Sequence, residues 1–434
     1  MGCRATSTDP LARRVPLRLD EKRRKEGRVI FVGIDWSEAH HDVCVLDEQG
    51  TVLAKGKVSD DVSGVGRLHA MAAEHADDPS EVVVGIETDR GLLVGSLVQA
   101  GYRVYAINPL AASRYRDRHA VSRAKSDPGD AKVLADLVRT DRQNHREVAD
   151  DSELAEAVKV LARAHQNLIW SRQRQVNALR NTLREFYPGA LRAFTTSQLA
   201  TIEACSVLAM APTPTWARDK LTLQRLRRSL SASGRKRNLD RRAKQILHAL
   251  QAPELSAPAL VEQAYGDVVG SLVVVIDGLT HQIAKLEAEL AERFEGHPDA
   301  EIITSLPGLS SVLGARVLAE FGDDPTRYQD ARARRRYAGT APITRASGTR
   351  LVVLARVARN RRLFDACYLW AFSSITTSAG ARRYYEGHRA RGKTHHQALR
   401  ALANRWIGIL HGCLTRHEPY RESVAWVAPV EAAA

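Results

Sequence analysis

The 434-residue chain has little cysteine, and its five cysteines stand far apart. Because none belongs to a Cys-x-x-Cys pair or a paired Cys/His spacing, the sequence supports neither a zinc site nor a disulfide framework. Long apolar runs are also missing. No stretch reaches the roughly 18 consecutive apolar residues of a membrane span, and the N-terminus lacks the apolar core of a secretory signal. We therefore expect a cytoplasmic protein without a membrane partner.

Acidic residues are outnumbered by basic ones. The chain has 64 Lys and Arg against 50 Asp and Glu, which gives a net charge of +14 and a pI near 9.8. The excess is concentrated in residues 218–244, with eleven basic and two acidic residues, and in residues 327–362, with eleven arginines and one acid. Such clusters favour a polyanionic partner, nucleic acid first of all. They predict a nucleoid-associated location.

Two carboxylates end short apolar runs in the first third of the chain. Asp35 follows the run at residues 29–34, and Glu87 follows the run at residues 82–86. Each run predicts a buried strand. Because ligands of open α/β sheets bind beyond the carboxyl ends of the strands, we expect Asp35 and Glu87 to converge there.

Two further carboxylates, Asp127 and Asp130, open a predicted helix at residues 131–139. Their spacing of three residues places both on one helix face. Carboxylate oxygens are the hard ligands that Mg²⁺ prefers, and a pair of such ions can clamp both oxygens of a phosphoryl displacement. Each residue alone is also a common cap or strand-end residue, but together with Asp35 and Glu87 they form a candidate Mg²⁺ site.

The strand that carries Asp35 precedes two more predicted strands, residues 41–46 and 51–58, with an Asp-Glu-Gln-Gly turn between them. A β-meander whose first strand carries the leading carboxylate is similar to ribonuclease H-like domains. We therefore expect an α/β domain of this kind at the N-terminal end.

Beyond residue 152 the pattern becomes helical, with apolar residues at helical spacing up to residue 187 and again over residues 260–294. Two such helices suit an antiparallel coiled coil that acts as a spacer or dimerisation arm, and packing inside one helical domain is the alternative. The predicted fold class is α/β plus all-α: an RNase H/RuvC-like domain, a coiled-coil middle and a mainly helical C-terminal domain. The expected divisions are a flexible basic arm, the RuvC-like domain, the helical region, the C-terminal domain and a tail, at residues 1–28, 29–145, 150–298, 299–422 and 423–434.

Residues 302–318 have the pattern of a helix, a Leu-Pro-Gly-Leu turn and a second helix. In a helix-hairpin-helix, the loop from Leu306 to Leu309, which contains Pro307 and Gly308, offers backbone N–H groups to a nucleic-acid phosphate without reading the sequence. A plain helical hairpin is the alternative.

A loop rich in Gly, Pro and Ser at residues 337–350 lies among the arginines of the second basic cluster. Arginine side chains suit bidentate recognition of phosphate, which favours a phosphate-binding surface here. A solvated basic face is the alternative interpretation. Ser347 precedes Gly348, a pair that by itself is typical of a turn. The residues expected to contact phosphates are Arg334, Arg335, Arg336, Arg345, Arg350 and Asn360.

The chain from about residue 29 to residue 420 resembles one family, the insertion-sequence transposases with a RuvC-like DEDD domain and a C-terminal serine transposase domain, known as bridge-RNA-guided recombinases. The order and spacing of short motifs carry the resemblance: Gly33-Ile-Asp35, Ile86-Glu87-Thr88, Asn108-Pro109, Lys125-Ser-Asp-Pro-Gly-Asp-Ala131, Leu306-Pro-Gly-Leu309, Ala338-Gly-Thr-Ala-Pro342 and Ser347-Gly348. The resemblance implies that Asp35, Glu87, Asp127 and Asp130 bind Mg²⁺. It also implies that Ser347 is the nucleophile of a 5′-phosphoserine DNA intermediate.

The resemblance further implies the partners. Family members act on the DNA of element ends and targets with a non-coding guide RNA. The carboxylate domain of one subunit faces the serine domain of another, so a homo-oligomer, a dimer or a tetramer, is expected. The sequence departs from the family pattern at residues 87–91, where Asp89 becomes a rival ligand to Glu87.

Other functions compete with this one. A DEDD nuclease or Holliday-junction resolvase would use the same carboxylates with water as the nucleophile, and Ser347 would be a turn residue. A tyrosine recombinase would use His396, Arg400 and Tyr420, but the spacing from histidine to arginine is one residue too long for His-x-x-Arg. An actin-like ATPase or sugar kinase needs a second glycine-rich phosphate loop, which the sequence lacks. A purely structural nucleic-acid-binding protein would bind no metal.

Overall fold

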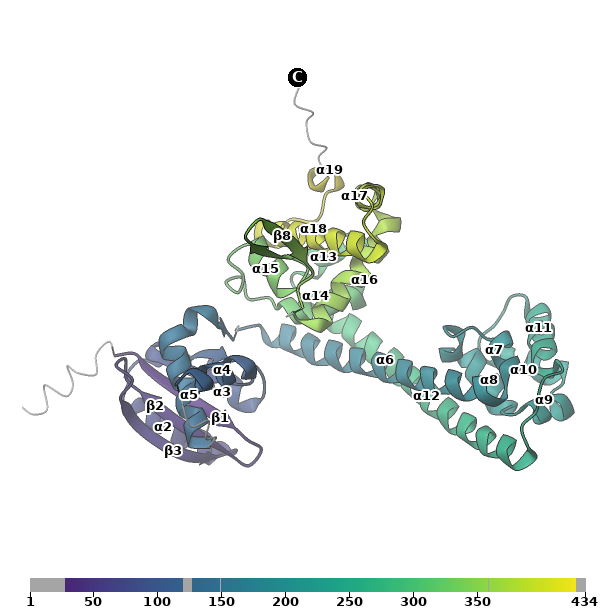
Figure 1. Ribbon diagram of the computed structural model, residues 1–434, viewed down its shortest axis with the longest axis horizontal. Helices are drawn as coiled ribbons and strands as arrows, with labels where there is room; N and C mark the ends of the chain where they lie inside the picture. Colours follow the sequence, from purple (N-terminus) through teal and green to yellow (C-terminus); the bar gives the residue numbers. More distant parts are fainter. Residues whose placement is uncertain (1–27, 120–126, 149, 358, 427–434) are drawn as a thin grey trace, which may run out of the picture. The chain divides into compact units, whose positions relative to one another are not determined.

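The computed structural model describes residues 28–119, 127–148, 150–357 and 359–426. The predicted basic arm, apart from Arg28, and most of the predicted tail therefore lie outside the described residues. The chain divides into two compact units, Met1–Asp150 and Asp151–Ala434 (Figure 1). Each unit is built around its own core.

The first unit contains a six-stranded sheet in the order β3-β2-β1-β4-β5-β6. The first three strands form an antiparallel meander, β4 and β5 run parallel to β1, and β6 is antiparallel to β5. The predicted meander with Asp35 in its first strand is confirmed. The strands are β1 (Ile30–Trp36), β2 (His40–Leu46), β3 (Val52–Ser59), β4 (Val82–Ile86), β5 (Arg103–Ala106) and β6 (Arg146–Glu147).

Helices pack on both faces of this sheet. One core contains Leu68 of α2 and Leu97 of α3, and the opposite core contains Ala112 of α4 and Leu134 of α5. The α/β class of the N-terminal domain is therefore confirmed. The helices are α2 (Val62–Ala73), η1 (Pro79–Glu81), α3 (Leu92–Gln99), α4 (Pro109–His119), α5 (Asp127–Asp141) and η2 (Arg142–Asn144).

The second unit is organised by two long helices, α6 (Glu153–Phe186) and α12 (Ala259–Glu295). The Tyr265 hydroxyl donates to Glu185 Oε2 at 2.7 Å, and Arg172 Nη1 donates to Thr280 Oγ1 at 3.4 Å. Because the late residues of one helix pair with the early residues of the other, the two helices are antiparallel. Both helices predicted from apolar periodicity are present, and Figure 1 shows them side by side.

Short helices between α6 and α12 form a subdomain at one end of this pair, which we call the tip subdomain (residues 187–258). Its core contains Leu208, Leu226 and Ile246 together with Leu183 of α6 and Val273 of α12. Its elements are α7 (Pro188–Ala193), η3 (Gln198–Ala200), α8 (Ile202–Met210), α9 (Pro214–Lys220), α10 (Leu223–Ala232) and α11 (Leu239–Gln251).

The C-terminal helices pack at the other end of the pair, around the stacked rings of Trp370 and Trp406, whose centroids are 5.5 Å apart. This core also contains Val158 of α6 and Leu290 of α12, so the predicted helical region and C-terminal domain share it. The elements are α13 (Ala300–Thr304), α14 (Ser311–Phe321), α15 (Ala331–Tyr337), β7 (Ile343–Ser347), β8 (Arg350–Leu354), α16 (Arg361–Thr377), α17 (Ala379–Ala390), α18 (His395–Arg416) and α19 (Glu422–Ala425).

The prediction of a loop at residues 337–350 is wrong in its second half. β7 and β8 form an antiparallel hairpin with Ser347 opposite Arg350. The sequence has few of the alternating apolar residues that indicate a strand, because both faces of this hairpin are exposed.

Among the described residues, α12 is the one helix long and apolar enough to cross a membrane by length and composition alone. Its most apolar stretch has a mean hydropathy of 1.5, and 28% of that stretch is buried. The helix also carries Asp267 and Asp277 and packs Val269 and Val273 in the core of the tip subdomain. Length and hydropathy alone are therefore weak evidence that α12 crosses a membrane. The expectation from the sequence differs because it considered only uninterrupted apolar runs, and these acids interrupt the run in α12.

Candidate functional site

Asp35 and Glu87 lie at the same edge of the sheet. In the parallel pair of β1 and β4, Ile34 is opposite Ile86, so Asp35 and Glu87 are the next residues of neighbouring strands. Asp35 is half-buried near the end of β1, and Glu87 is exposed directly after β4. The backbone register therefore brings the two residues together as the sequence predicts, while their binding of metal stays a prediction.

Two glycines let helix α5 pack directly against the strands that carry these carboxylates. A Cβ added to Gly33 would overlap the Ala131 carbonyl oxygen, and one added to Gly85 would lie 2.6 Å from another backbone oxygen of α5. The helix therefore rests directly on the sheet at both glycines. Because side chains alternate along a strand, Asp35 faces the same side of β1 as Gly33, the side that carries α5. Glu87 directly follows the last residue of β4.

The beginning of α5 supplies the other predicted carboxylates. Asp127 is the first residue of this helix, but its side chain lies outside the described ones. Asp130 is 7% exposed, and its Oδ1 accepts from Nη2 of Arg116 on α4 at 2.6 Å. A buried carboxylate is costly without a counter-charge, and Arg116 provides one.

The sequence analysis missed Asp42 and Arg116 as members of this site. Asp42 is 9% exposed and lies opposite Asp35 in the β1–β2 ladder, so both side chains share the face that carries α5. The sequence could have identified Asp42 because it is spaced at two-residue intervals with the buried Cys44 and Leu46, so that all three side chains lie on the same face of the strand. Arg116 follows no local pattern that identifies its partner.

The donor types at this edge fit a divalent metal. Among the described side chains, no three His, Cys, Asp or Glu groups lie close enough together to hold a metal ion, and Asp127 is not among them. Asp35, Asp42, Glu87 and Asp130 all offer carboxylate oxygens, the ligands of hard cations. Asp130 pairs with Arg116 through Oδ1, so a metal ion would compete with Arg116 for that oxygen.

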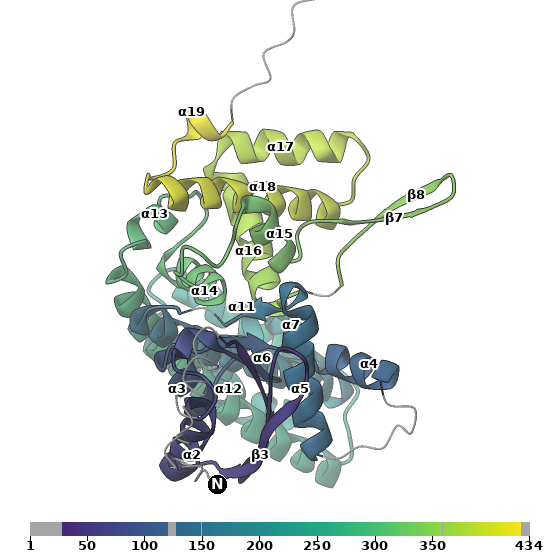
Figure 2. The ribbon, with the colours of Figure 1, turned by 90° about the vertical axis from the view of Figure 1, so that its left-hand side faces the viewer.

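Ser347 lies at the tip of the β7–β8 hairpin, which projects away from the helices of the second unit (Figure 2). Gly348 and Thr349 form the two-residue turn, and Gly348 has a φ of 56°. Glycine at the first central position is what a type II′ hairpin turn requires. All residues from Thr344 to Leu351 are exposed. The serine is therefore presented to solvent on a narrow ribbon.

One face of this ribbon combines Ser347 with two arginines. Arg350 lies directly opposite Ser347 in the hairpin, and Arg345 precedes it by two residues on the same strand. Alternation therefore puts all three side chains on one face. No described residue donates to or accepts from the Ser347 hydroxyl. Two cations thus flank a hydroxyl that lacks a base in its own hairpin.

The three neighbouring arginines of α15 lie in three different environments. Arg334 does not lie on the predicted phosphate-contacting surface, because it is 7% exposed and its guanidinium lies over the rings of Phe321 and Tyr328 at 5.1 and 4.8 Å. Arg335 is half-buried and lines a pocket. Arg336 is exposed, as predicted.

Asn360 is engaged in holding helices together. Its Oδ1 accepts from two backbone N–H groups at the start of α16, and its Nδ2 donates to Glu320 Oε2 at 2.7 Å and to the Tyr337 hydroxyl at 3.1 Å. Its predicted contact with phosphate therefore competes with a complete set of internal partners.

Pro307 and Gly308 form a turn between α13 and α14 that packs on α16. The Pro307 carbonyl accepts from Trp370 Nε1 at 3.0 Å, and a Cβ added to Gly308 would lie 2.7 Å from the Ser374 nitrogen. The glycine has a φ of +88°. Its conformation is thus required by packing, and phosphate binding by this turn stays a prediction.

The first basic cluster, residues 218–244, contains several ion pairs. Arg235 and Arg242 both donate to Glu203, at 2.6 and 2.8 Å, and Arg227 pairs with Asp240 at 2.6 Å. These ion pairs lie within the tip subdomain and stabilise its fold. The charge left for an anionic partner is smaller than the count of basic residues suggests.

The structure disfavours Tyr420 as a nucleophile. Burial, followed by its hydrogen bond to Glu422, raises the pKa of Tyr420 to about 12. Its hydroxyl also accepts from Trp426 Nε1 at 2.9 Å. His395 and His396 bond to the Tyr385 and Tyr368 hydroxyls at 2.6 and 2.5 Å. These side chains are therefore engaged in internal hydrogen bonds, which disfavours the tyrosine recombinase alternative.

Comparison with known families gives two matches. A model described as a transposase, of the DEDD type, matches residues 32–188, and a model described as "Transposase IS116/IS110/IS902 family" matches residues 300–386. The two matched segments contain the carboxylate edge and the Ser347 hairpin respectively.

Curated relatives match over nearly the whole chain. The "Mini-circle putative transposase for IS117" of Streptomyces coelicolor is 46% identical over 94% of this chain and 100% of its own length. The "Insertion element IS900 uncharacterized 42 kDa protein" of Mycobacterium paratuberculosis is 30% identical over 92% of this chain and 99% of its own length. The "Insertion element IS116 uncharacterized 44.8 kDa protein" of Streptomyces clavuligerus is 31% identical over 89% of this chain and 94% of its own length.

Proposed function

The chain belongs to the IS116/IS110/IS902 family of transposases, and we propose that it moves its insertion element by serine recombination with Ser347 as the nucleophile. As a transposase it binds, cleaves and rejoins DNA. The observation that carries the proposal is the face of the β7–β8 hairpin on which Ser347 lies between Arg345 and Arg350. A hydroxyl exposed at the end of a ribbon and flanked by two guanidinium groups suits attack on a phosphodiester.

In the proposed reaction, Ser347 Oγ attacks the phosphorus of a DNA phosphodiester. The Oγ–P bond forms as the P–O3′ bond breaks, the serine proton ends on the released 3′-hydroxyl, and the 5′-phosphate stays on Ser347. Arg345 and Arg350 balance the charge of the non-bridging oxygens. Attack by a new 3′-hydroxyl reverses the step and regenerates the serine, so the phosphate bond is conserved.

The carboxylate edge has the complementary role. Asp35, Glu87, Asp127 and Asp130 would hold a divalent metal, with Mg²⁺ as the proposed ion. When bound, the metal supplies positive charge to a developing oxyanion and makes a proton acceptor at neutral pH available. Arg116 orients Asp130 through their ion pair, and Asp42 adds a further carboxylate opposite Asp35. Asp89 is exposed after β4 and is retained as the rival to Glu87.

We place the two halves of the site on different subunits of a homo-oligomer, a dimer or a tetramer. The support is that Ser347 lacks a hydrogen-bonding partner among the described residues, while the carboxylates lie in the other compact unit. The proposal also includes a non-coding guide RNA. It is supported by exposed arginines such as Arg336 and Arg345 that suit backbone contacts, as expected where base pairing reads the sequence.

A metal-dependent nuclease or junction resolvase with water as the nucleophile is the second candidate. The observation in its favour is that no described residue bonds to the Ser347 hydroxyl, and that its position beside Gly348 is explained by the turn.

Denaturing electrophoresis separates the two candidates. Purified protein would be incubated with Mg²⁺, element-end RNA and labelled junction DNA, and a covalent protein–DNA adduct is expected. Ser347→Ala should remove the adduct, whereas Thr349→Ala, which removes a hydroxyl from the same exposed turn, should retain it. Asp127→Ala should abolish cleavage altogether. Cleaved DNA without an adduct that is unaffected by Ser347→Ala but lost in Asp127→Ala would establish the nuclease instead.

A further inference from the structure

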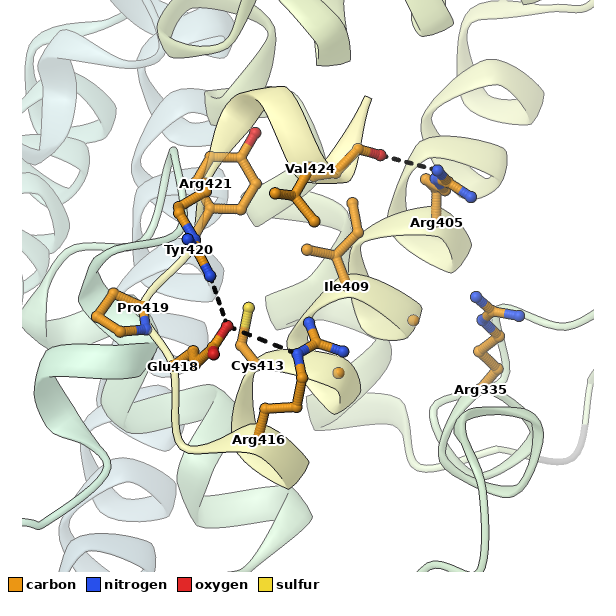
Figure 3. Close-up of a pocket in the computed structure, with 13 residues that line it drawn as sticks. Arg335, Arg405, Ile409, Cys413, Arg416, Glu418, Pro419, Tyr420, Arg421 and Val424 are labelled. Carbon is orange, nitrogen blue, oxygen red and sulfur yellow. Dashed lines mark hydrogen bonds and ion pairs between the residues drawn. The ribbon is translucent and has the colours of Figure 1, made fainter. Parts of the chain in front are cut away.

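A pocket lined by arginines lies in the second unit between α15, α18 and residues 418–425 (Figure 3). Its cavity volume is about 290 Å³. Four of the lining side chains are cations and one is an anion, which makes the pocket strongly positive. The charged lining residues are Arg335, Arg405, Arg416, Glu418 and Arg421.

Glu418 neutralises only the two arginines on its own side of the pocket. Its Oε2 accepts from Arg421 Nη2 at 2.8 Å and lies 3.7 Å from Arg416 Nε. The dashed lines in Figure 3 mark both pairs, while Arg335 and Arg405 stand on the other side. The charge of these last two arginines is therefore uncompensated by Glu418.

Arg405 is held in place without a counter-ion among the described residues. Its Nη2 donates to the Ala425 carbonyl at 2.8 Å, and its guanidinium lies over the Trp426 ring at 5.6 Å. Both contacts leave the positive charge in place and leave other N–H groups of this guanidinium available. Arg405 is a fixed, exposed cation at the pocket.

Arg335 is the unsatisfied member of the set. Its guanidinium makes no hydrogen bond or ion pair with a described residue, and its Nε is buried. It lies across α18 at Gly408, where an added Cβ would overlap its Nη2. Burial and then the like charge of Arg405 lower the pKa of Arg335. A buried donor without a partner beside a like charge is costly, and an anion between the two would remove both costs.

We propose that this pocket binds a backbone phosphate of a nucleic-acid strand, with Arg335 and Arg405 as its two ligands. Guanidinium forks match the geometry of phosphate oxygens, and the family's substrate is a nucleic acid. The phosphate belongs to either DNA or RNA, and the test distinguishes them. The inference rests on the transposase function and is independent of the serine mechanism.

The test compares binding of the full chain to a fluorescent element-end DNA duplex and to a single-stranded RNA by anisotropy over a salt series. Arg335→Ala and Arg405→Ala should each weaken binding of at least one probe about tenfold, as expected for a charged hydrogen bond. Each should also reduce the slope of log affinity against log salt by about one. Loss with the duplex alone assigns the phosphate to DNA, and loss with the RNA alone assigns it to RNA.

Matched variants distinguish a phosphate contact in the pocket from a general loss of positive charge. Arg332→Ala removes an exposed arginine of the same helix α15 that does not line the pocket, and it should change affinity less than about twofold, since an exposed surface charge contributes little. Thr349→Ala, in the exposed hairpin turn, should bind with wild-type affinity and slope. Because Arg405 is exposed, its alanine variant is expected to fold even if Arg335→Ala does not. Wild-type affinity and slope of Arg405→Ala and of folded Arg335→Ala with both probes would overturn the proposal.

Discussion

Gly33 and Gly85 are the residues that let helix α5 approach the carboxylate edge. Neither contributes a functional group, yet an added Cβ at either position would meet backbone atoms of α5 first, and at Gly85 also the Val138 side chain. Backbone atoms cannot move aside without shifting the whole helix. The start of that helix carries Asp127 and Asp130, so the geometry of the site depends on these glycines.

We expect Gly33→Ala to destabilise the first unit by about 1–3 kcal/mol, as overpacking of a core does. Thermal unfolding by calorimetry measures this change. The control is Gly66→Ala in α2, where an added Cβ meets nothing within 4 Å and where alanine should stabilise the helix by up to about 1 kcal/mol. Equal stability of the two variants would contradict the close packing of α5 on the sheet.

Arg334, Arg335 and Arg336 show what a count of charges does not reveal. The sequence groups them as one phosphate-binding cluster, but consecutive residues of a helix point in directions about 100° apart. One side chain therefore stacks on aromatic rings, the next lines the pocket and the third is exposed. Which of the three faces the core depends on distant residues such as Phe321, and no local pattern reports this.

Among the elements, those with strong periodicity were predictable. The meander, the strand before Glu87, and helices α6 and α12 follow from apolar spacing alone. The β7–β8 hairpin and the tip subdomain did not follow, because the hairpin buries almost nothing and the short helices of the tip are defined by their shared core. For the candidate site, the sequence predicted the edge shared by Asp35 and Glu87, but not Asp42, whose strand position became meaningful only through its register with Asp35.

Helix α6 begins at a buried ionic junction. The Asp151 side chain is 2% exposed and pairs with Arg327 Nη1 at 2.8 Å, and its Oδ1 accepts from the Asp323 backbone nitrogen at 3.1 Å. The next residue, Ser152, caps the helix by accepting from the Ala155 nitrogen. One carboxylate thus joins the start of α6 to the segment after α14.

We expect Asp151→Ala to destabilise the second unit by about 3–5 kcal/mol, because it leaves the buried Arg327 charge without its partner. Urea unfolding monitored by circular dichroism measures this. The control is Glu156→Ala, which removes an exposed acid that pairs with Lys159. Its loss should cost at most about 1 kcal/mol, as for other surface pairs. Similar losses in the two variants would mean that the junction does not hold α6.

For the whole molecule, the proposed sharing of the site between subunits predicts complementation. A mixture of Ser347→Ala and Asp35→Asn chains should recover recombination that neither variant shows alone, because some assemblies then contain one intact serine and one intact carboxylate edge in contact. The measurement is the yield of rejoined DNA against the mixing ratio, with a maximum near equal amounts. A mixture of Ser347→Ala with Asp130→Asn serves as a second pairing. No recovery in either mixture would indicate a site completed within one chain.

The antiparallel pair of α6 and α12 has a consequence for how relatives can differ in size. Its two ends are sealed by separate cores, and the chain leaves and returns through the same end. Adding seven residues to each helix would keep the packed faces in register and move the tip subdomain outward by about 10.5 Å. Paired insertions of this length would therefore move the tip subdomain outward in fixed steps, while the cores at both ends of the helix pair stay folded.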